Sequence, residues 1–383
     1  MLNNVTSQTN QTYYIQLDGL RFLAVISVML GHWLAIGHLK SILGGIGVNL
    51  FFVLSGFLIA GILIRNKNSI QANESTLLFS VKQFYIRRFL RIFPIYYLVI
   101  LISYIINFEL CRKIIWWLLS YTSNIYWIIN GPLIGHFAHL WSLAVEEQFY
   151  ILFPFFILLT PKRLLPLFLS IIICFSPSLR LILLCFLHSK EVSTYSLMPC
   201  CLDSFALGAI LAFLLIFNKK KLSQILNLYW LLIVNLFFFL LCSIYPFLPS
   251  SFHTYFFTIF SEVFTRLFFS ICCFWIIGVS VLYGFKGIIK LFLENKLVVY
   301  LGRISYGLYV YHFFMSAFSP YLHWQILLPV FLRLHISFPF TNNTYWVAAW
   351  YFILTLLIST ISWYLVETPL NKLKKHFKYM KTE

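Results

Sequence analysis

A series of apolar segments, each long enough to cross a lipid bilayer, constrains this chain more than any other feature. A helix needs about 20 mainly apolar residues to span a hydrocarbon layer of about 30 Å. Charged residues make up only 10% of the sequence, against about 25% in soluble domains. The sequence therefore predicts an all-α integral membrane protein with about ten transmembrane helices. Their approximate bounds are 17–39, 46–64, 93–110, 137–160, 164–187, 201–217, 226–244, 255–282, 298–318 and 345–366.

One more apolar stretch, near residues 114–130, needs a separate interpretation. If it crossed the membrane, every later lysine cluster would move to the opposite side. Its Trp116, Trp117 and Trp127 suit the boundary between headgroups and hydrocarbon. We therefore expect an interfacial or re-entrant segment here.

The basic residues are distributed unevenly between the two sides of this predicted bundle. With the amino terminus inside, nineteen fall in cytoplasmic segments and five in outer segments. Cytoplasmic loops carry the excess of lysine and arginine, so we expect both termini in the cytoplasm. This topology also accounts for the net charge of +17 without nucleic acid as a partner.

The domain organisation expected from these segments is simple. Residues 1–16 form a cytoplasmic segment, residues 17–366 the transmembrane domain and residues 367–383 a basic cytoplasmic tail. The polar start of the chain and the absence of a cleavage site favour a retained first helix over a signal peptide. No appended soluble domain is expected, and the spacing of the eight cysteines predicts neither a metal site nor a disulfide framework.

Arg21 and His32 lie within the first predicted span. Eleven steps of about 100° bring them to within about 20° of one face, about 16 Å apart along the helix axis. An anion at Arg21 and a reaction at His32 would fit this arrangement. The alternatives are an arginine that reaches the headgroups and a structural histidine.

Arg87, Arg88 and Arg91 precede the third span. Arginine binds phosphate oxygens bidentately, so Arg88 and Arg91 are candidates for a phosphate site. The alternative is a topology anchor or a contact with lipid headgroups.

The densest polar segment runs from His139 to Tyr150 in the fourth span. Glu146 shares a helical face with His139 and Ser142. Glu146 and Glu147 are adjacent carboxylates in an apolar span, where ionisable groups are costly and mark functional sites. This segment therefore favours a functional role over a structural one.

The ninth predicted span places Ser305, Tyr309 and His312 on one face. Its small residues equally suit close helix packing. At the end of the last span, Glu367 precedes Pro369. A carboxylate opposes the helix dipole there, so we expect Glu367 to pair with an arginine.

These motifs, in this order and on ten spans, resemble acyltransferase family 3 over essentially the whole chain. The family comprises polytopic membrane acyltransferases that O-acetylate bacterial surface polysaccharides, lipopolysaccharide and related glycans. The matching elements are Leu17–Arg21 with His32, Gly47–Phe57, Arg88 and Arg91 with Pro94, Trp141–Leu143 with Glu146, Ser305-Tyr306 with His312, and Glu367 with Pro369.

Two features depart from the family pattern. Relatives often carry an arginine shortly before the residue that matches Asp203, whereas Pro199, Cys200, Cys201 and Leu202 stand there in this chain. The role of Asp203 is therefore left open. Some relatives also carry an extracytoplasmic hydrolase-like domain, which this sequence lacks.

The resemblance implies transfer of an acetyl group from cytoplasmic acetyl-CoA to a hydroxyl of a cell-envelope glycan, such as O-antigen, capsule or exopolysaccharide, in a free or lipid-linked form. It implies the bacterial cytoplasmic membrane as the location and no metal. Arg21, Arg88 and Arg91 would bind the donor, and His32 would act as general base, with Glu146 orienting its ring. The expected acceptor-side or supporting residues are His139, Trp141, Ser142, Glu147, Ser305, Tyr309 and His312.

Three alternatives stay open at this stage. A covalent acyl-enzyme on His32 or Ser142 is one. The acyl group can be acetyl or a longer acid such as succinyl. A transporter or flippase for a lipid-linked glycan would also carry charges inside the membrane.

Overall fold

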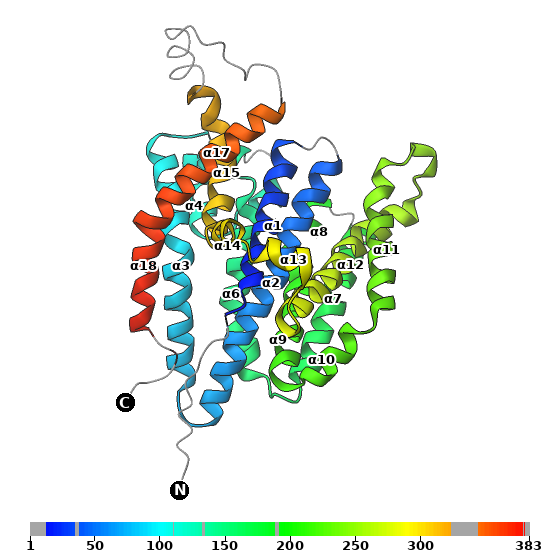
Figure 1. The fold of residues 1–383 in the computed structure, drawn as a ribbon. Coiled ribbons are helices and arrows are strands. Elements are labelled where there is room, and N and C mark those ends of the chain that lie inside the picture. The colour runs from blue at the N-terminus through cyan, green and yellow to red at the C-terminus, as the bar shows by residue number, and fades with distance from the viewer. Residues whose placement is uncertain are drawn as a thin grey trace.

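The computed structural model describes residues 13–34, 38–109, 111–131, 135–187, 191–322, 344–377 and 379, and this part of the chain is helical without strands (Figure 1). The long helices are α1 (Ile15–Trp33), α2 (His38–Gln71), α3 (Leu77–Ile105), α6 (Leu140–Leu159), α7 (Leu165–Cys185), α9 (Leu202–Phe217), α11 (Tyr229–Ile244), α12 (Tyr255–Leu282), α15 (Ser305–Leu322) and α17 (Thr344–Ser362). The shorter α-helices are α4 (Cys111–Leu119), α5 (Ser123–Asn130), α8 (Glu191–Ser196), α10 (Lys219–Leu226), α13 (Gly287–Leu293), α14 (Lys296–Arg303) and α18 (Thr368–Lys372).

Nine helical stretches within the described residues are long and apolar enough to cross a membrane, which confirms nine of the predicted spans. The ninth predicted span, 298–318, is divided, because α14 ends at Arg303 and α15 begins at Ser305. The second span was predicted too short at 46–64, whereas α2 covers 34 residues. The stretch near 114–130 forms α4 and α5, with nine and eight residues. Neither is long enough to cross the bilayer.

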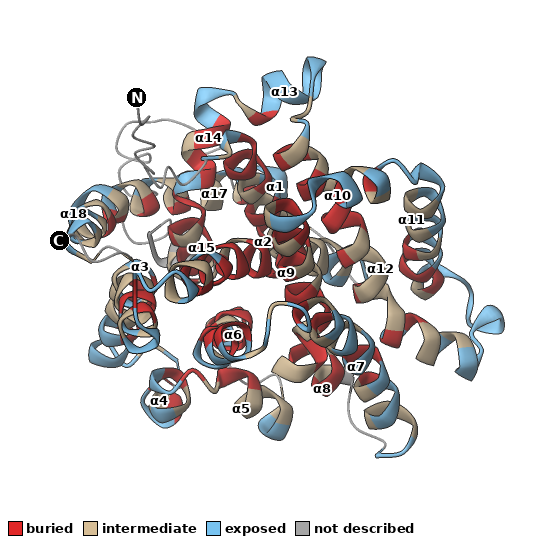
Figure 2. Cartoon of the chain, turned by 90° about the horizontal axis from the view of Figure 1, so that it is seen from below, coloured by how far each residue is buried: buried red, intermediate tan, exposed pale blue. Residues whose placement is uncertain are grey.

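The centre of the bundle is formed by α1, α2 and α9. Glycines allow this close packing, since a Cβ atom on Gly56 of α2 would lie 2.1 Å from the Phe205 carbonyl oxygen of α9. A Cβ atom on Gly208 would lie equally close to the Val53 carbonyl oxygen. Small residues permit such backbone contact between membrane helices. Figure 2 shows the buried residues concentrated on the central helices, while α7 and α11 turn exposed residues outward.

The far end of α2 is tied to α6 by a buried lysine. Lys67 is only 5% exposed, and its Nζ donates to the carbonyl oxygens of Ile157 and Leu158 at 3.0 and 2.8 Å and of Thr160 at 2.5 Å. These carbonyls belong to the last turn and the carboxyl end of α6, where helical acceptors lack partners of their own. The contact fixes α6, and hence Glu146, against α2.

Candidate active site

Two adjoining cavities lie between α1, α2, α3, α6 and α15. The inner cavity, of about 100 Å³, is lined by residues that include Phe51, Ser55, Glu146, Ser142, Ser305 and Tyr309. The entrance cavity, of about 270 Å³, is lined by residues that include Tyr13, Asp18, Ile62, Arg87, Lys374 and Tyr379. Both cavities are lined by Arg21, Leu58, Arg88 and Arg91. The arginines therefore stand at the junction between them.

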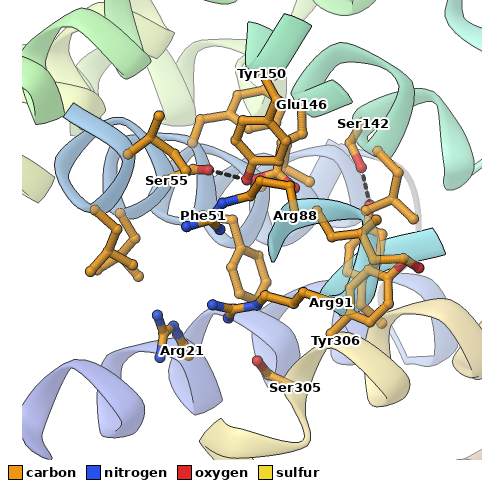
Figure 3. Close-up of a pocket in the computed structure, with 18 residues that line it drawn as sticks. Arg21, Phe51, Ser55, Arg88, Arg91, Ser142, Glu146, Tyr150, Ser305 and Tyr306 are labelled. Atoms are coloured by element: carbon orange, nitrogen blue, oxygen red, sulfur yellow. Dashed lines mark hydrogen bonds between the residues drawn. The ribbon is translucent and has the colours of Figure 1, made fainter. Parts of the chain in front are cut away.

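The three arginines that the sequence proposed for donor binding come together here, from α1 and α3. Figure 3 shows their side chains around one space. Arg21 contacts the Asp18 carboxylate at 2.6 Å. Arg88 stacks over the Tyr150 ring, with its guanidinium carbon 5.7 Å from the ring centroid, and its buried Nε lacks a partner among the described residues. Arg91 is exposed to the cavity. Three cations around one space favour a polyanionic ligand.

Asp18 supplies the nearest negative charge at this junction. Besides Arg21, its carboxylate accepts a hydrogen bond from the Tyr13 hydroxyl and lies 3.7 Å from Arg303. Burial, followed by the bond to Asp18, raises the pKa of the Tyr13 phenol. Tyr13 therefore stays protonated and holds Asp18 beside the entrance cavity.

Glu146 lies on the wall of the inner cavity. Its carboxyl group lies near the hydroxyls of Ser55 and Tyr150 and near the guanidinium groups of Arg88 and Arg91. Ser55 and Tyr150 are also hydrogen-bonded to each other (Figure 3). Glu146 thus belongs with the arginines at the junction.

The predicted pairing of Glu146 with His32 is not formed in this structure. The Nδ1 atom of His32 is buried without a hydrogen-bond partner among the described residues, and its closest ring neighbours belong to Phe313 and His312. The physical reason is helix packing, which places Glu146 on the wall of the inner cavity and the His32 ring against α15.

Three histidines from α1, the start of α6 and α15 form a cluster, which we name the histidine cluster. The ring centroid of His312 lies 5.3 Å from that of His32 and 4.9 Å from that of His139. His312 Nδ1 donates to the Tyr309 carbonyl oxygen at 2.6 Å, and His139 Nε2 donates to the Val310 carbonyl oxygen at 3.0 Å. A carbonyl only accepts, so these bonds fix both tautomers.

The other ring nitrogens of His139 and His312 are therefore acceptors. His312 Nε2 and His139 Nδ1, like His32 Nδ1, are buried without a partner within the described ranges. Buried polar atoms are nearly always hydrogen-bonded, and exceptions call for an explanation. A ligand that donates hydrogen bonds would satisfy these nitrogens.

A tyrosine and a serine separate the histidine cluster from the inner cavity. Tyr309 and Ser142 both line the inner cavity, and their hydroxyl oxygens are 2.5 Å apart. Each also lies within hydrogen-bond distance of the His139 carbonyl oxygen, at 3.1 and 3.2 Å. The Tyr309 ring centroid is 5.7 Å from that of His139. A path of contacting polar side chains thus leads from the wall of the inner cavity through Tyr309, His139 and His312 to His32.

The remaining predicted site residues take different places. Ser305 lines the inner cavity, whereas Trp141 packs its ring against Phe52 and Tyr195. Glu147 lines neither cavity. Its Oε1 atom is buried without a hydrogen-bond partner in the described part of the chain, and its charge acts on nearby tyrosines, including Tyr96.

Two further carboxylates differ from expectation. Asp203 is fully buried and pairs at 2.6 Å with Arg180 of α7, so an arginine distant in sequence supplies its partner. Glu367 was predicted to pair with an arginine, and this prediction was wrong. Its buried Oε1 has no hydrogen-bond partner among the described residues. The reason is that the end of the helix places this oxygen against Gly307. Arg91 influences the carboxylate only electrostatically.

Comparison with known protein families identifies the family of this chain. The acyltransferase domain model of acyltransferase family 3 matches residues 14–379. The chain belongs to this family. No solved structure was found to match it.

Several curated members of the family are similar to this chain. A peptidoglycan O-acetyltransferase, OatA, of Listeria monocytogenes is 35% identical over 173 residues, which cover 41% of this chain and 26% of that protein. A putative O-acetyltransferase of Staphylococcus aureus strain COL is 28% identical, with 96% of this chain and 59% of the relative covered. O-acetyltransferase OatA of Staphylococcus aureus strain NCTC 8325 is 27% identical, with 96% and 58% covered. The match therefore spans less than two thirds of each relative's length.

Proposed function

We propose that this acyltransferase-family chain is a membrane O-acyltransferase. It moves an acetyl or similar short acyl group from cytoplasmic acyl-CoA to a hydroxyl of a cell-envelope glycan, such as O-antigen, capsule or exopolysaccharide. The names of the relatives add peptidoglycan to these acceptors. The observation that carries the proposal is the polar path from the inner cavity, which the junction arginines line, to the histidine cluster.

The donor end of this path is the entrance cavity. Arg87 and Lys374 line it together with the three junction arginines, and hydrogen bonds between cations and phosphate oxygens are about twice as strong as neutral ones. In the proposed orientation, with both termini in the cytoplasm of a bacterial cell, this cavity faces cytoplasmic acetyl-CoA. The phosphates bind at the arginines and the acyl arm enters the inner cavity.

His32 acts as the general base in the proposed reaction. The acceptor hydroxyl donates its hydrogen bond to the free ring nitrogen of His32, which takes the proton as the oxygen attacks the thioester carbonyl carbon. The carbon–sulfur bond breaks, and the proton passes to the departing thiolate to give free CoA and the ester. One of the Ser142 and Tyr309 hydroxyls turns its proton from the other hydroxyl to the carbonyl oxygen as its negative charge develops.

Labelled acyl-CoA tests this proposal. The full chain in lipid nanodiscs is incubated with radiolabelled acetyl-CoA and envelope glycan fractions, and label is expected in the glycan. Mass analysis of the glycan identifies the acyl group, and mass analysis of the protein detects any acyl-enzyme on His32 or Ser142. If no label is transferred but a lipid-linked glycan crosses the bilayer, the chain is a flippase instead.

A further inference from the structure

A third cavity, of about 410 Å³, is the largest of the three and lies between the first part of α2, α8, α11 and α12. We name it the lateral cavity, and its lining includes Asn49, Tyr195, Ser243, Tyr245, Glu262 and Arg266. Among the described residues, none that lines it also lines the inner or the entrance cavity.

Three buried polar atoms in the lining of the lateral cavity lack a hydrogen-bond partner among the residues that the structure describes. They are Asn49 Oδ1, Ser243 Oγ and Arg180 Nε, in side chains that are 7%, 8% and 1% exposed. The amide oxygen only accepts, the guanidinium nitrogen only donates, and the hydroxyl does both. A matching ligand must therefore offer donors and acceptors together, as hydroxyl groups do. A hydrocarbon chain offers neither.

The charges around the lateral cavity argue for a neutral ligand. Arg180 is paired with Asp203, and Arg266 donates to the carbonyl oxygens of Tyr195 at 2.7 Å and Cys200 at 3.3 Å. Glu262 lines the cavity itself, whereas Asp203 is the partner of a lining arginine. These two arginines are thus matched by two carboxylates, in contrast to the cation-rich entrance cavity. A phosphate would find little free positive charge here.

One tyrosine of the lining connects the lateral cavity with the candidate active site. The guanidinium carbon of Arg266 lies over the Tyr195 ring, 5.2 Å from its centroid. The Tyr195 ring also contacts Trp141, with centroids 4.8 Å apart. Trp141 is followed in the sequence by Ser142, which lines the inner cavity. The Tyr195 and Trp141 rings therefore lie between a ligand in the lateral cavity and the candidate active site.

We propose that the lateral cavity binds an uncharged pyranose unit of a glycan. Its hydroxyl groups satisfy the unpartnered atoms of Asn49, Ser243 and Arg180. That this glycan is the acyl acceptor rests on the proposed function, whereas sugar binding itself does not.

Two adjacent glycines provide a matched pair of variants. A Cβ atom on Gly45, which lines the cavity, meets only the Tyr195 hydroxyl, at 4.0 Å. A Cβ atom on Gly44 meets no atom within 4 Å among the described residues, and Gly44 is not part of the lining. Gly45→Leu should therefore fill the cavity. Gly44→Leu makes the same change in the same helix and leaves the cavity open.

The test measures binding of an N-acetylglucosamine tetrasaccharide to the full chain in lipid nanodiscs, because maltoside detergents carry sugars of their own. Gly45→Leu should weaken binding about tenfold or more, and Gly44→Leu should leave it unchanged. Asn49→Leu should also weaken it about tenfold, since it removes a hydrogen bond from a buried site. CoA binding should be unaffected in all three variants, which shows that they are folded.

Each outcome bears on the proposal separately. Equal tetrasaccharide binding by wild type and Gly45→Leu overturns it, as does a wild-type protein that retains only phospholipid and binds no sugar. If the sugar binds but no acyl group is transferred, the lateral site stands and the proposed function fails. If transfer occurs, Gly45→Leu should raise KM for the acceptor with little change in kcat.

Discussion

The arginine junction and the histidine cluster differ in the charge of their side chains and in the partners of their polar atoms. At the junction, Arg21 and Arg91 border open cavities, and the carboxylates of Asp18 and Glu146 balance the cations only in part. In the histidine cluster, the rings pack on one another and on Phe313, and their bound nitrogens donate to backbone carbonyls. The first region is suited to a polyanion. The second holds neutral imidazoles that can accept a proton.

The largest effect is expected from removing a base from the histidine cluster. His32→Ala should lower kcat by about 10²–10⁴-fold, the usual contribution of general base catalysis, while CoA binding at the distant junction stays within about twofold. Steady-state transfer and equilibrium CoA binding measure the two quantities. The control is His376→Ala, in an exposed residue near the end of the chain. Unchanged turnover in His32→Ala would remove the cluster from the reaction.

A change at the arginine junction should instead weaken CoA binding. Arg91→Ala removes a cation that faces both cavities and should weaken CoA binding about 10- to 100-fold, since hydrogen bonds to charged groups contribute about 1.5–3 kcal/mol. The salt dependence of binding should also decrease. Lys82→Ala, on an exposed face of α3, is the matched control. Equal losses in both variants would indicate a general surface charge effect.

The Tyr309–Ser142 pair joins the two regions, and a double-mutant cycle tests that link. Tyr309→Phe and Ser142→Ala should each lower kcat about three- to tenfold, because each removes one hydroxyl of a 2.5 Å contact worth about 1 kcal/mol. The double variant should be less impaired than the product of the single effects. Strictly multiplicative losses would show that the two hydroxyls act independently.

The smallest effect is expected from a change of Glu146. Its size tests whether Glu146 acts with the arginine junction or with the histidine cluster. Glu146→Gln keeps the shape of a side chain that lies near Ser55 and Tyr150, so transfer should fall about fivefold or less, or about 1 kcal/mol. A loss as large as that of His32→Ala would mean that Glu146 orients His32 during the reaction and moves from its present position. The pH profiles of the two variants would then also coincide.

The number and order of the helices followed from hydropathy, because a membrane leaves few alternatives to apolar helices. Arg21 and His32 could be placed on one face, since helical spacing is local. The partner of Glu146 could not be predicted, because the neighbours of α6 depend on how helices pack. Likewise, Arg180 and Asp203 belong to different helices. Hydropathy also missed the polar end of α2, where Lys67 satisfies the carboxyl end of α6.

The helix α2 lines all three cavities, with residues 38–49 at the lateral cavity, 48–59 at the inner cavity and 58–62 at the entrance cavity. It contains no proline, and its 34 residues extend about 51 Å at about 1.5 Å per residue. The separation of the cavities along this helix is therefore set by the register of one backbone and does not vary with the thickness of the surrounding lipid. An additional helical turn between residues 50 and 58 would increase the distance between the inner and the entrance cavity. The protein would then accept a donor with a longer arm.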